Sequence, residues 1–148
     1  MKSTGPVSHQ NPVDDVIRQI LTSIRTVAMA GASDKSNRPV YGVSEFLNER
    51  GIRTVPVNPR LAGREVLGET CYGSLQDLPE PVDMVDCFIN SARVGAIVDE
   101  AIAVGAPVVW LQLNVIDEAA AARATAAGLT VVMDRCPAIE WRRLGIGD

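Results

Sequence analysis

The sequence predicts a doubly wound α/β fold, and three observations carry that prediction. Five short apolar runs without polar alternation recur along the chain, which is typical of strands covered on both faces. Segments with apolar residues at helical spacing lie between these runs. Three of the helical segments end at a glycine that a strand closely follows: Gly51, Gly105 and Gly128. Strands and helices that alternate in this way imply right-handed crossovers and a parallel sheet wrapped by helices.

The elements follow one another in a regular order. Residues 1–12 mix Ser, Gly, Pro, His and Gln without periodicity, so we expect a flexible N-terminal tail, followed by a single domain over residues 13–148. The domain begins with an amphipathic helix, whose apolar residues recur at helical spacing: Val13, Val16, Ile17, Ile20, Leu21 and Ile24. The five strands are expected at residues 26–30, 54–57, 85–89, 108–113 and 130–133.

The connections between these strands are predicted to be helical. Residues 43–50, 94–102 and 118–127 carry the helical patterns. Between the second and third strands, residues 74–78 leave room only for a short helix, which Pro79 and Pro81 end. We therefore expect a Rossmann-like sheet of five parallel strands in the order 3-2-1-4-5, with helices on both faces.

Composition and charge exclude several classes of protein. The chain has 148 residues, of which 47% are apolar and 22% charged, as in an ordinary globular domain. No apolar run is long enough to cross a bilayer, and the first residues lack the apolar core of a signal peptide, so we expect a cytoplasmic protein. The net charge of −4 argues against broad nucleic-acid binding. Residues 32–64, however, hold six basic and three acidic side chains, a local charge of +3 that leaves room for an anionic ligand.

The turn after the first strand, "GASDKSNRP", has the features of a phosphate cradle. In an open parallel sheet a ligand binds beyond the carboxyl ends of the strands where the strand order reverses, which we place between the first and fourth strands. The helix that begins near Pro39 offers unpaired N–H groups to an anion. Gly31 permits the sharp turn, Ala32 allows close approach, and Ser33 and Asn37 can donate to phosphate oxygens. The turn lacks the glycines of the dinucleotide fingerprint and is not a Walker loop, so a tight connection without a ligand is the alternative.

Residues after the later strands add candidates. The second strand ends at "VNPR" (57–60), where NAD-binding proteins carry an acid; Asn58 and Arg60 instead suggest an adenosine with a further phosphate, as in NADP and coenzyme A. Gln112, near the end of the fourth strand, faces the crevice in one of two pleat phases. Cys136 follows the fifth strand on the same side and is either a reactive thiol or a small structural one.

Six ordered blocks extend these local signals over nearly the whole chain: "VAMAGASDKSNRPVYGV", "VPVNP", "VLGETCYGSL", "VDCFINSARV", "IVDEAIAVGAPVVWLQL" and "AAGLTVVMDRCPAIEW". In these blocks the chain resembles the small bacterial and archaeal CoA-binding proteins. Their single domain is similar to the amino-terminal CoA-binding domain of the succinyl-CoA synthetase alpha subunit. The resemblance runs over residues 27–144.

The resemblance implies an extended coenzyme A lying across the strand ends. The pyrophosphate would lie near residues 31–38, and the 3'-phosphoadenosine near residues 57–60 and the loop after the third strand. The pantetheine arm would run toward Asn90, Ser91 and the end of the fourth strand. Tyr41 would line the site or act as a buried spacer. The candidate cofactor-binding residues are Gly31, Ala32, Ser33, Lys35, Asn37, Arg38, Tyr41, Asn58, Pro59, Arg60, Asn90, Ser91 and Gln112.

The resemblance carries no catalytic activity with it. Succinyl-CoA synthetase passes phosphate through a histidine in a separate domain, whereas His9, the one histidine of this chain, lies in the expected tail. We therefore identify no catalytic residue and no metal site, and expect a protein that binds coenzyme A or an acyl-CoA without chemistry of its own. Two alternatives stay open: a small NADP-binding redox protein, and a regulatory subunit of a separately encoded acyl-CoA enzyme.

Overall fold

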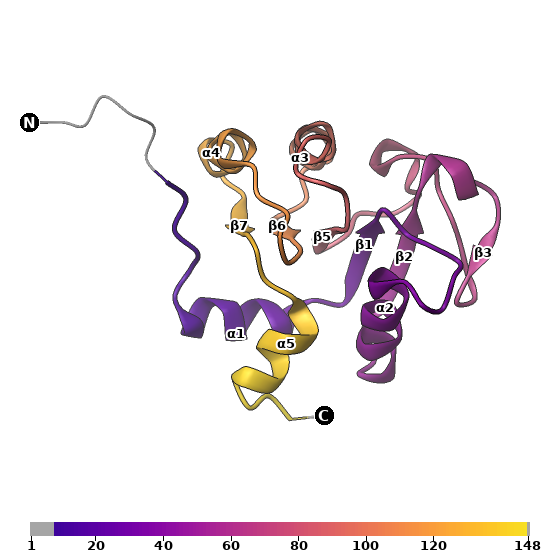
Figure 1. Ribbon diagram of the computed structural model, residues 1–148, viewed down its shortest axis with the longest axis horizontal. Helices are drawn as coiled ribbons and strands as arrows, with labels where there is room; N and C mark the ends of the chain where they lie inside the picture. Colours follow the sequence, from indigo (N-terminus) through magenta and orange to yellow (C-terminus); the bar gives the residue numbers. More distant parts are fainter. Residues whose placement is uncertain (1–7, 148) are drawn as a thin grey trace, which may run out of the picture.

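The centre of the molecule is a five-stranded parallel sheet. The computed structural model describes residues 8–147, and Figure 1 shows the sheet between two layers of helices. The strands are β1 (Thr26–Ala30), β2 (Arg53–Val57), β5 (Met84–Cys87), β6 (Val108–Leu111) and β7 (Thr130–Val132). All neighbouring strands pair in parallel. The doubly wound α/β class predicted from the sequence is confirmed.

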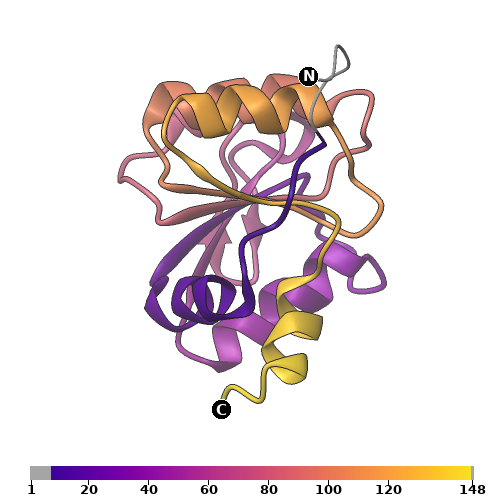
Figure 2. The same ribbon diagram turned by 90° about the vertical axis from the view of Figure 1, so that its left-hand side faces the viewer.

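Helices cover both faces of this sheet. On one face lie α1 (Asp14–Ser23), α2 (Pro39–Glu49) and α5 (Pro137–Arg143), and on the other lie α3 (Val94–Val104) and α4 (Glu118–Ala126) (Figures 1 and 2). An apolar cluster fills the space between the sheet and each layer. Among residues 8–147, no helix combines the length and the apolar character needed to cross a membrane.

Side-chain alternation along the strands divides the core between the two layers. In β6, Val109 and Leu111 pack on the α3–α4 side, whereas Trp110 points to the α1–α2–α5 side. Trp110 is fully buried, and its Nε1 donates to the carbonyl oxygen of Arg135 at 2.8 Å. The sheet is therefore covered on both faces, as its unbroken apolar runs require.

The order of the strands differs from the predicted 3-2-1-4-5. It is β2-β1-β5-β6-β7, or 2-1-3-4-5 when the five strands are numbered along the chain. Because β5 pairs with β1, β2 is an edge strand. Pro56 lies within β2 and turns its carbonyl outward, where it accepts from the amide of Tyr72 at 3.0 Å. A proline has no N–H to donate, so it favours an edge position; the predicted order, which gives β2 two partners, is wrong.

The chain passes from β2 to β5 without a long helix. It forms η1 (Pro59–Leu61), a small hairpin of β3 (Glu65–Val66) and β4 (Glu69–Thr70), and then η2 (Leu75–Asp77). The last of these is the short helix expected at residues 74–78. Since β5 returns to the far side of β1, the strand order reverses between β1 and β5 rather than between the first and fourth strands.

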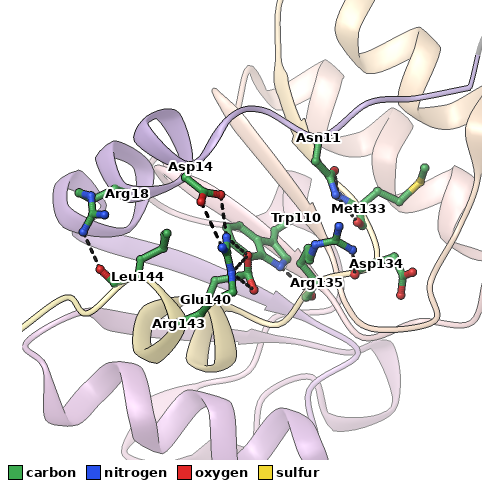
Figure 3. Close-up of polar contacts among 10 residues, drawn as sticks. All are labelled: Asn11, Asp14, Arg18, Trp110, Met133, Asp134, Arg135, Glu140, Arg143 and Leu144. Carbon is green, nitrogen blue, oxygen red and sulfur yellow. Dashed lines mark hydrogen bonds and ion pairs between the residues drawn. The ribbon is translucent and has the colours of Figure 1, made fainter.

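Part of the predicted tail packs against the domain. Residues 1–7 lie outside the described residues, but Asn11 takes the place of a neighbouring strand beside β7. Its Nδ2 donates to the carbonyl of Met133 at 2.9 Å, and its Oδ1 accepts from the amide of Met133 at 2.8 Å (Figure 3). Edge strands leave such groups unpaired unless something covers them. The side chain of Asn11 therefore belongs to the folded unit.

Replacing Asn11 by alanine is expected to lower the free energy of unfolding by about 1–3 kcal/mol, because the N–H and C=O of buried Met133 lose their partner. Urea denaturation followed by tryptophan fluorescence measures this change. The exposed neighbour Gln10 provides the control, since Gln10→Ala is expected to stay within about 0.5 kcal/mol of the parent. Equal stability of the two variants would show that the hydrogen bonds of the Asn11 side chain contribute nothing measurable to stability.

Charged contacts join α5 to α1. The guanidinium of Arg143 lies 2.8 Å from the carboxylate of Asp14 and 2.9 Å from that of Glu140, and Arg18 donates to the carbonyl of Leu144 at 2.7 Å (Figure 3). The hydrogen bond from Arg143 lowers the pKa of Asp14 below its usual value. Asp14 and Arg143 are exposed, so we attribute orientation of α5, rather than much stability, to this contact.

Candidate functional site

A cleft of about 680 Å³ opens beyond the carboxyl ends of the strands. It lies where the strand order reverses, between the turn after β1 and the loops after β5 and β6. This is the usual ligand position in an open α/β sheet, and the volume is typical of small-molecule sites. Nine of the thirteen residues predicted from the sequence line the cleft: Gly31, Ala32, Ser33, Lys35, Arg38, Asn58, Arg60, Asn90 and Gln112.

The other four predicted residues lie close to the cleft in sequence but do not line it. Asn37 is exposed in the first turn, and Tyr41 is half-buried in α2. Pro59 begins η1 and is exposed. Ser91 is half-buried in the loop after β5, where its hydroxyl is engaged by the backbone.

Gly31 is held tightly between two strands. Its φ is +83°, and a Cβ built on it would lie 2.4 Å from the carbonyl oxygen of Phe88. The amides of Gly31 and Ala32 both donate to the carbonyl of Val57, at 3.0 and 3.2 Å. These two amides therefore fasten the turn to the end of β2, and any anion contact must come from the amides that follow.

The rest of the first turn leaves backbone donors available. Within residues 8–147, four of its amides have no acceptor: those of Ser33, Asp34, Ser36 and Asn37. The hydroxyl of Ser33 accepts from the amide of Lys35 at 3.1 Å, which shapes the turn. Pro39 is the first residue of α2, and Arg38 immediately precedes it. A proline at the first helical position costs nothing, because the N–H that it lacks would have no partner within the helix. Of the four residues with free amides, Ser33 and Asp34 line the cleft, so the turn brings two free N–H groups and the positive end of α2 to it.

The end of β2 supplies the second wall. The side-chain amide of Asn58 donates to the carbonyl of Ala32 at 2.8 Å, and its Oδ1 accepts from the amide of Arg60 at 2.9 Å. The side chain of Asn58 therefore ties β2 to the first turn and fixes the start of η1. The side chain of Arg60 is exposed and lines the cleft. Asp34 is the one acid among the described residues that line the cleft, and it faces Arg64 at 3.8 Å.

The third wall is formed by the loops after β5 and β6. Ser91 Oγ donates to the carbonyl of Asn114 at 3.2 Å and accepts from the amide of Ile116 at 2.8 Å. The amide of Asn114 donates in turn to Asp134 at 2.7 Å. Asn114 and Asp134 have φ of +67° and +60°, a left-handed conformation that few side chains tolerate as well as Asn and Asp. The hydrogen bonds of Ser91 thus join the loop after β5, which carries Asn90, to the loop after β6, which carries Asn114.

Two polar side chains are buried at or beneath the floor of the cleft. Gln112 is 8% exposed, and within the described chain its Oε1 has no hydrogen-bond partner. Asp86, in β5, is fully buried, and neither of its carboxyl oxygens has a partner among residues 8–147. Burial raises the pKa of the Asp86 carboxyl well above its usual value, which favours its neutral form.

Comparison with known proteins identifies the family. The family model described as CoA binding domain matches residues 25–142, which include every strand of the sheet and the whole cleft. The chain belongs to the CoA binding domain family. A Bacillus subtilis (strain 168) protein, YneT, is 33% identical over 127 residues, which are 86% of this chain and 93% of that protein.

Solved structures related to this CoA binding domain share its fold over most of its length. A protein of Pyrococcus horikoshii OT3 is 39% identical and covers 97% of this chain and 99% of its own, with a TM-score of 0.86. One from Thermus thermophilus is 37% identical over 90% of this chain, also at 0.86, and covers 99% of its own. The dinucleotide-forming acetyl-coenzyme A synthetase of Ca. Korarchaeum cryptofilum, at 22% identity and a TM-score of 0.64, shows the fold alone: the match covers 82% of this chain and 28% of that protein.

The three cysteines of the CoA binding domain are buried and lie outside the residues that line the cleft. Desolvation raises the pKa of the Cys71 and Cys87 thiols. Cys136 immediately precedes α5 and packs in the core beneath α1, α2 and α5. Of its two interpretations from sequence, a reactive thiol or a structural one, this position favours the structural one.

Sequence reasoning missed several residues of the cleft. Leu113 and Val115 line it on either side of Asn114, and Phe88 and Ile89 do so after β5. Apolar residues at the ends of apolar strands give no signal of their own. Asp86 was also missed, although an acid inside the apolar run "VDCFI" is a recognisable anomaly, because few acids are buried without a partner.

Proposed function

We propose that this domain binds coenzyme A, or an acyl-CoA, in the cleft at the carboxyl ends of its strands, without catalysing a reaction itself. The observation that carries the proposal is the first turn: four amides without acceptors beside Lys35 and Arg38, at the start of α2. Membership of the CoA binding domain family supports the choice of ligand. An anion with two linked phosphates suits such a row of donors.

The diphosphate is assigned to residues 33–38. Its oxygens would accept from the free amides of the turn and from the side chains of Lys35 and Arg38, which are exposed and line the cleft. Gly31 contributes indirectly, because only a residue without Cβ lets β1 turn this close to Phe88. The role proposed for Gly31 and Ala32 is therefore to position the cradle.

The 3'-phosphoadenosine is assigned to the end of β2. Arg60 is the exposed cation that the start of η1 brings to the cleft, and Asn58 fixes its backbone at 2.9 Å. From the diphosphate the uncharged pantetheine arm would run past Asn90 toward the loop after β6. That end of the cleft is lined by apolar side chains, including Ile89, Leu113 and Val115.

The absence of catalysis is part of the proposal. His9, the single histidine of the sequence, lies near Asn11 with a ring nitrogen 3.1 Å from its Oδ1, away from the residues that line the cleft. The resemblance noted above carries no catalytic residue into this cleft, and the titratable side chains among its described lining residues are Asp34 and the cations Lys35, Arg38 and Arg60. We therefore propose a binding protein whose ligand reacts elsewhere.

Replacing Arg60 by alanine tests the assignment of the 3'-phosphate. Loss of one charge-assisted contact at a partly exposed site is expected to weaken coenzyme A binding roughly tenfold. Binding of dephospho-CoA, which lacks the 3'-phosphate, is expected to stay unchanged. Isothermal titration calorimetry measures both affinities. Arg25→Ala is the matched control, because Arg25 is an exposed arginine that precedes β1 at the opposite end of the sheet.

The parent protein provides the broader test. Millimolar coenzyme A is expected to raise the melting temperature, since a ligand far above its Kd stabilises the folded state. No shift would overturn the proposal. Tighter binding of NADPH than of coenzyme A would favour the redox-protein alternative instead, because that ligand also carries an additional phosphate on its adenosine.

A further inference from the structure

Two neighbouring buried side chains under the cleft have polar atoms without partners. Within the described residues these are Oε1 of Gln112 and both carboxyl oxygens of Asp86. Gln112 lines the cleft and is more than nine-tenths buried, while Asp86 is completely buried. Buried polar groups in native proteins nearly always have a hydrogen-bond partner, so both call for a physical explanation.

The sheet register places these two residues on one face of adjacent strands. Asp86 in β5 pairs with Trp110 in β6, and paired residues point to the same side of a sheet. The ladder continues past the strands, because the amide of Gln112 donates to the carbonyl of Cys87 at 3.2 Å. Gln112 therefore follows Trp110 on the same face, two residues toward the cleft. From strand spacing and rise, its Cα lies about 8 Å from that of Asp86.

The chemistry of the two side chains is complementary. A neutral carboxyl has one O–H donor, and a glutamine amide has an acceptor, Oε1, and two donors on Nε2. A glutamine side chain is long enough to reach a diagonal neighbour, directly or through one water. When Oε1 accepts the proton of Asp86, Nε2 is turned toward the cleft as a donor.

The part of the ligand that meets Gln112 follows from its surroundings. Phe88, Leu113 and Val115 line the cleft around it, and the cations Lys35, Arg38 and Arg60 belong to the other walls. An uncharged chain with carbonyl acceptors fits this end better than a phosphate does. Pantetheine is such a chain, because it is largely apolar and carries two amides.

We propose that Gln112 donates Nε2–H to an amide carbonyl of the pantetheine arm, and that Asp86 is the positioning residue that holds Gln112 Oε1. The inference rests on the proposed function, since it assumes that the cleft takes coenzyme A. It makes Gln112 a specificity residue: Gln112 contacts the pantetheine arm of a ligand and makes no contact with the nucleotide half.

Four variants and two ligands test this arrangement. The ligands are coenzyme A and 3'-phospho-ADP, which keeps both phosphate groups and lacks pantetheine. Gln112→Met is expected to weaken coenzyme A binding about 5- to 50-fold and to leave 3'-phospho-ADP binding unchanged. Asp86→Ala is expected to produce a similar loss for coenzyme A alone. Asp86→Asn keeps a donor for Oε1 and is expected to stay within about twofold of the parent.

The double variant, Asp86→Ala with Gln112→Met, is expected to lose no more than Gln112→Met alone, because the two residues act through one contact. Calorimetric titration provides the affinities, and unchanged 3'-phospho-ADP binding shows that each variant is folded. If Asp86→Ala does not fold, Gln112→Met and Asp86→Asn still decide the question.

Equal losses for both ligands, or coenzyme A affinity unchanged in Gln112→Met, would overturn the inference. Additive losses in the double variant would overturn the positioning role of Asp86. Failure of the parent protein to bind coenzyme A at all is a different result, and it would overturn the proposed function instead.

Discussion

Gly31→Ala is expected to lower the free energy of unfolding by about 2–5 kcal/mol and to abolish ligand binding in the cleft. Two costs combine. A left-handed φ of +83° costs a residue with Cβ roughly 1–2 kcal/mol. The new methyl group would also lie 2.4 Å from the carbonyl oxygen of Phe88, and overpacking against a fixed neighbour costs a further 1–3 kcal/mol.

The backbone that must move to accept this methyl group belongs to the site. Phe88 N donates to the carbonyl of Ala30 at 2.9 Å, and the amide of Gly31 donates to Val57 at 3.0 Å, so the turn is fastened on both sides. Separation of β1 from β5 at this point displaces Phe88 and Ile89, which line the cleft. Chemical denaturation measures the loss of stability, and titration with coenzyme A measures the loss of binding.

Gly51→Ala is the matched control. Gly51 has nearly the same φ, +81°, but a Cβ there meets nothing within 4 Å. Its replacement is expected to cost only the conformational term, about 1–2 kcal/mol, and to leave binding intact. If both variants lose the same stability and both still bind, the close approach to Phe88 has no consequence for the site.

The strand and helix pattern could be predicted from the sequence, whereas the strand order could not be deduced from that pattern. Apolar runs such as residues 26–30 and 130–133 are visible because strands covered on both faces need apolar side chains at consecutive positions. Strand order depends on which edges meet in space, and alternation alone gives no information about it. Pro56 was the available signal, because a proline inside a strand favours the sheet edge that β2 occupies.

The location of the cleft could be predicted from the sequence better than the structural role of each residue that lines it. The turn at Gly31 marks the carboxyl end of β1 in any doubly wound sheet, so its neighbours line the cleft. Residue type, however, does not reveal which hydrogen bonds a polar side chain makes in the folded protein. Asn58 and Ser91 look like ligand donors in sequence, yet both bond the backbone of the loops that form the walls.

Asp86→Asn is expected to stabilise the domain, and the gain is expected to grow with pH. The Asp86 carboxyl has no partner among the described residues, and its burial raises its pKa well above the usual 3.8. The unfolded chain releases this proton near pH 4, whereas the folded chain releases it only at a higher pH. Rising pH therefore favours the unfolded state by about 1.4 kcal/mol per pH unit, until the pKa of the folded state is reached.

The pH-dependent destabilisation that arises from keeping the Asp86 carboxyl buried is thus absent below pH 4 and grows as pH rises from there toward the pKa of the folded state. Asparagine has nearly the same shape and does not titrate, so urea unfolding of parent and variant should give similar stabilities near pH 4 and diverging ones as the pH rises above 4. Asp77→Asn, an exposed change of the same net charge, separates the effect of burial from that of overall charge. Parallel plots of unfolding free energy against pH for the parent and Asp86→Asn would mean that Asp86 is ionised in the folded chain. A charged carboxylate at that depth would need a cation or several hydrogen-bond donors, which the described residues around it do not supply.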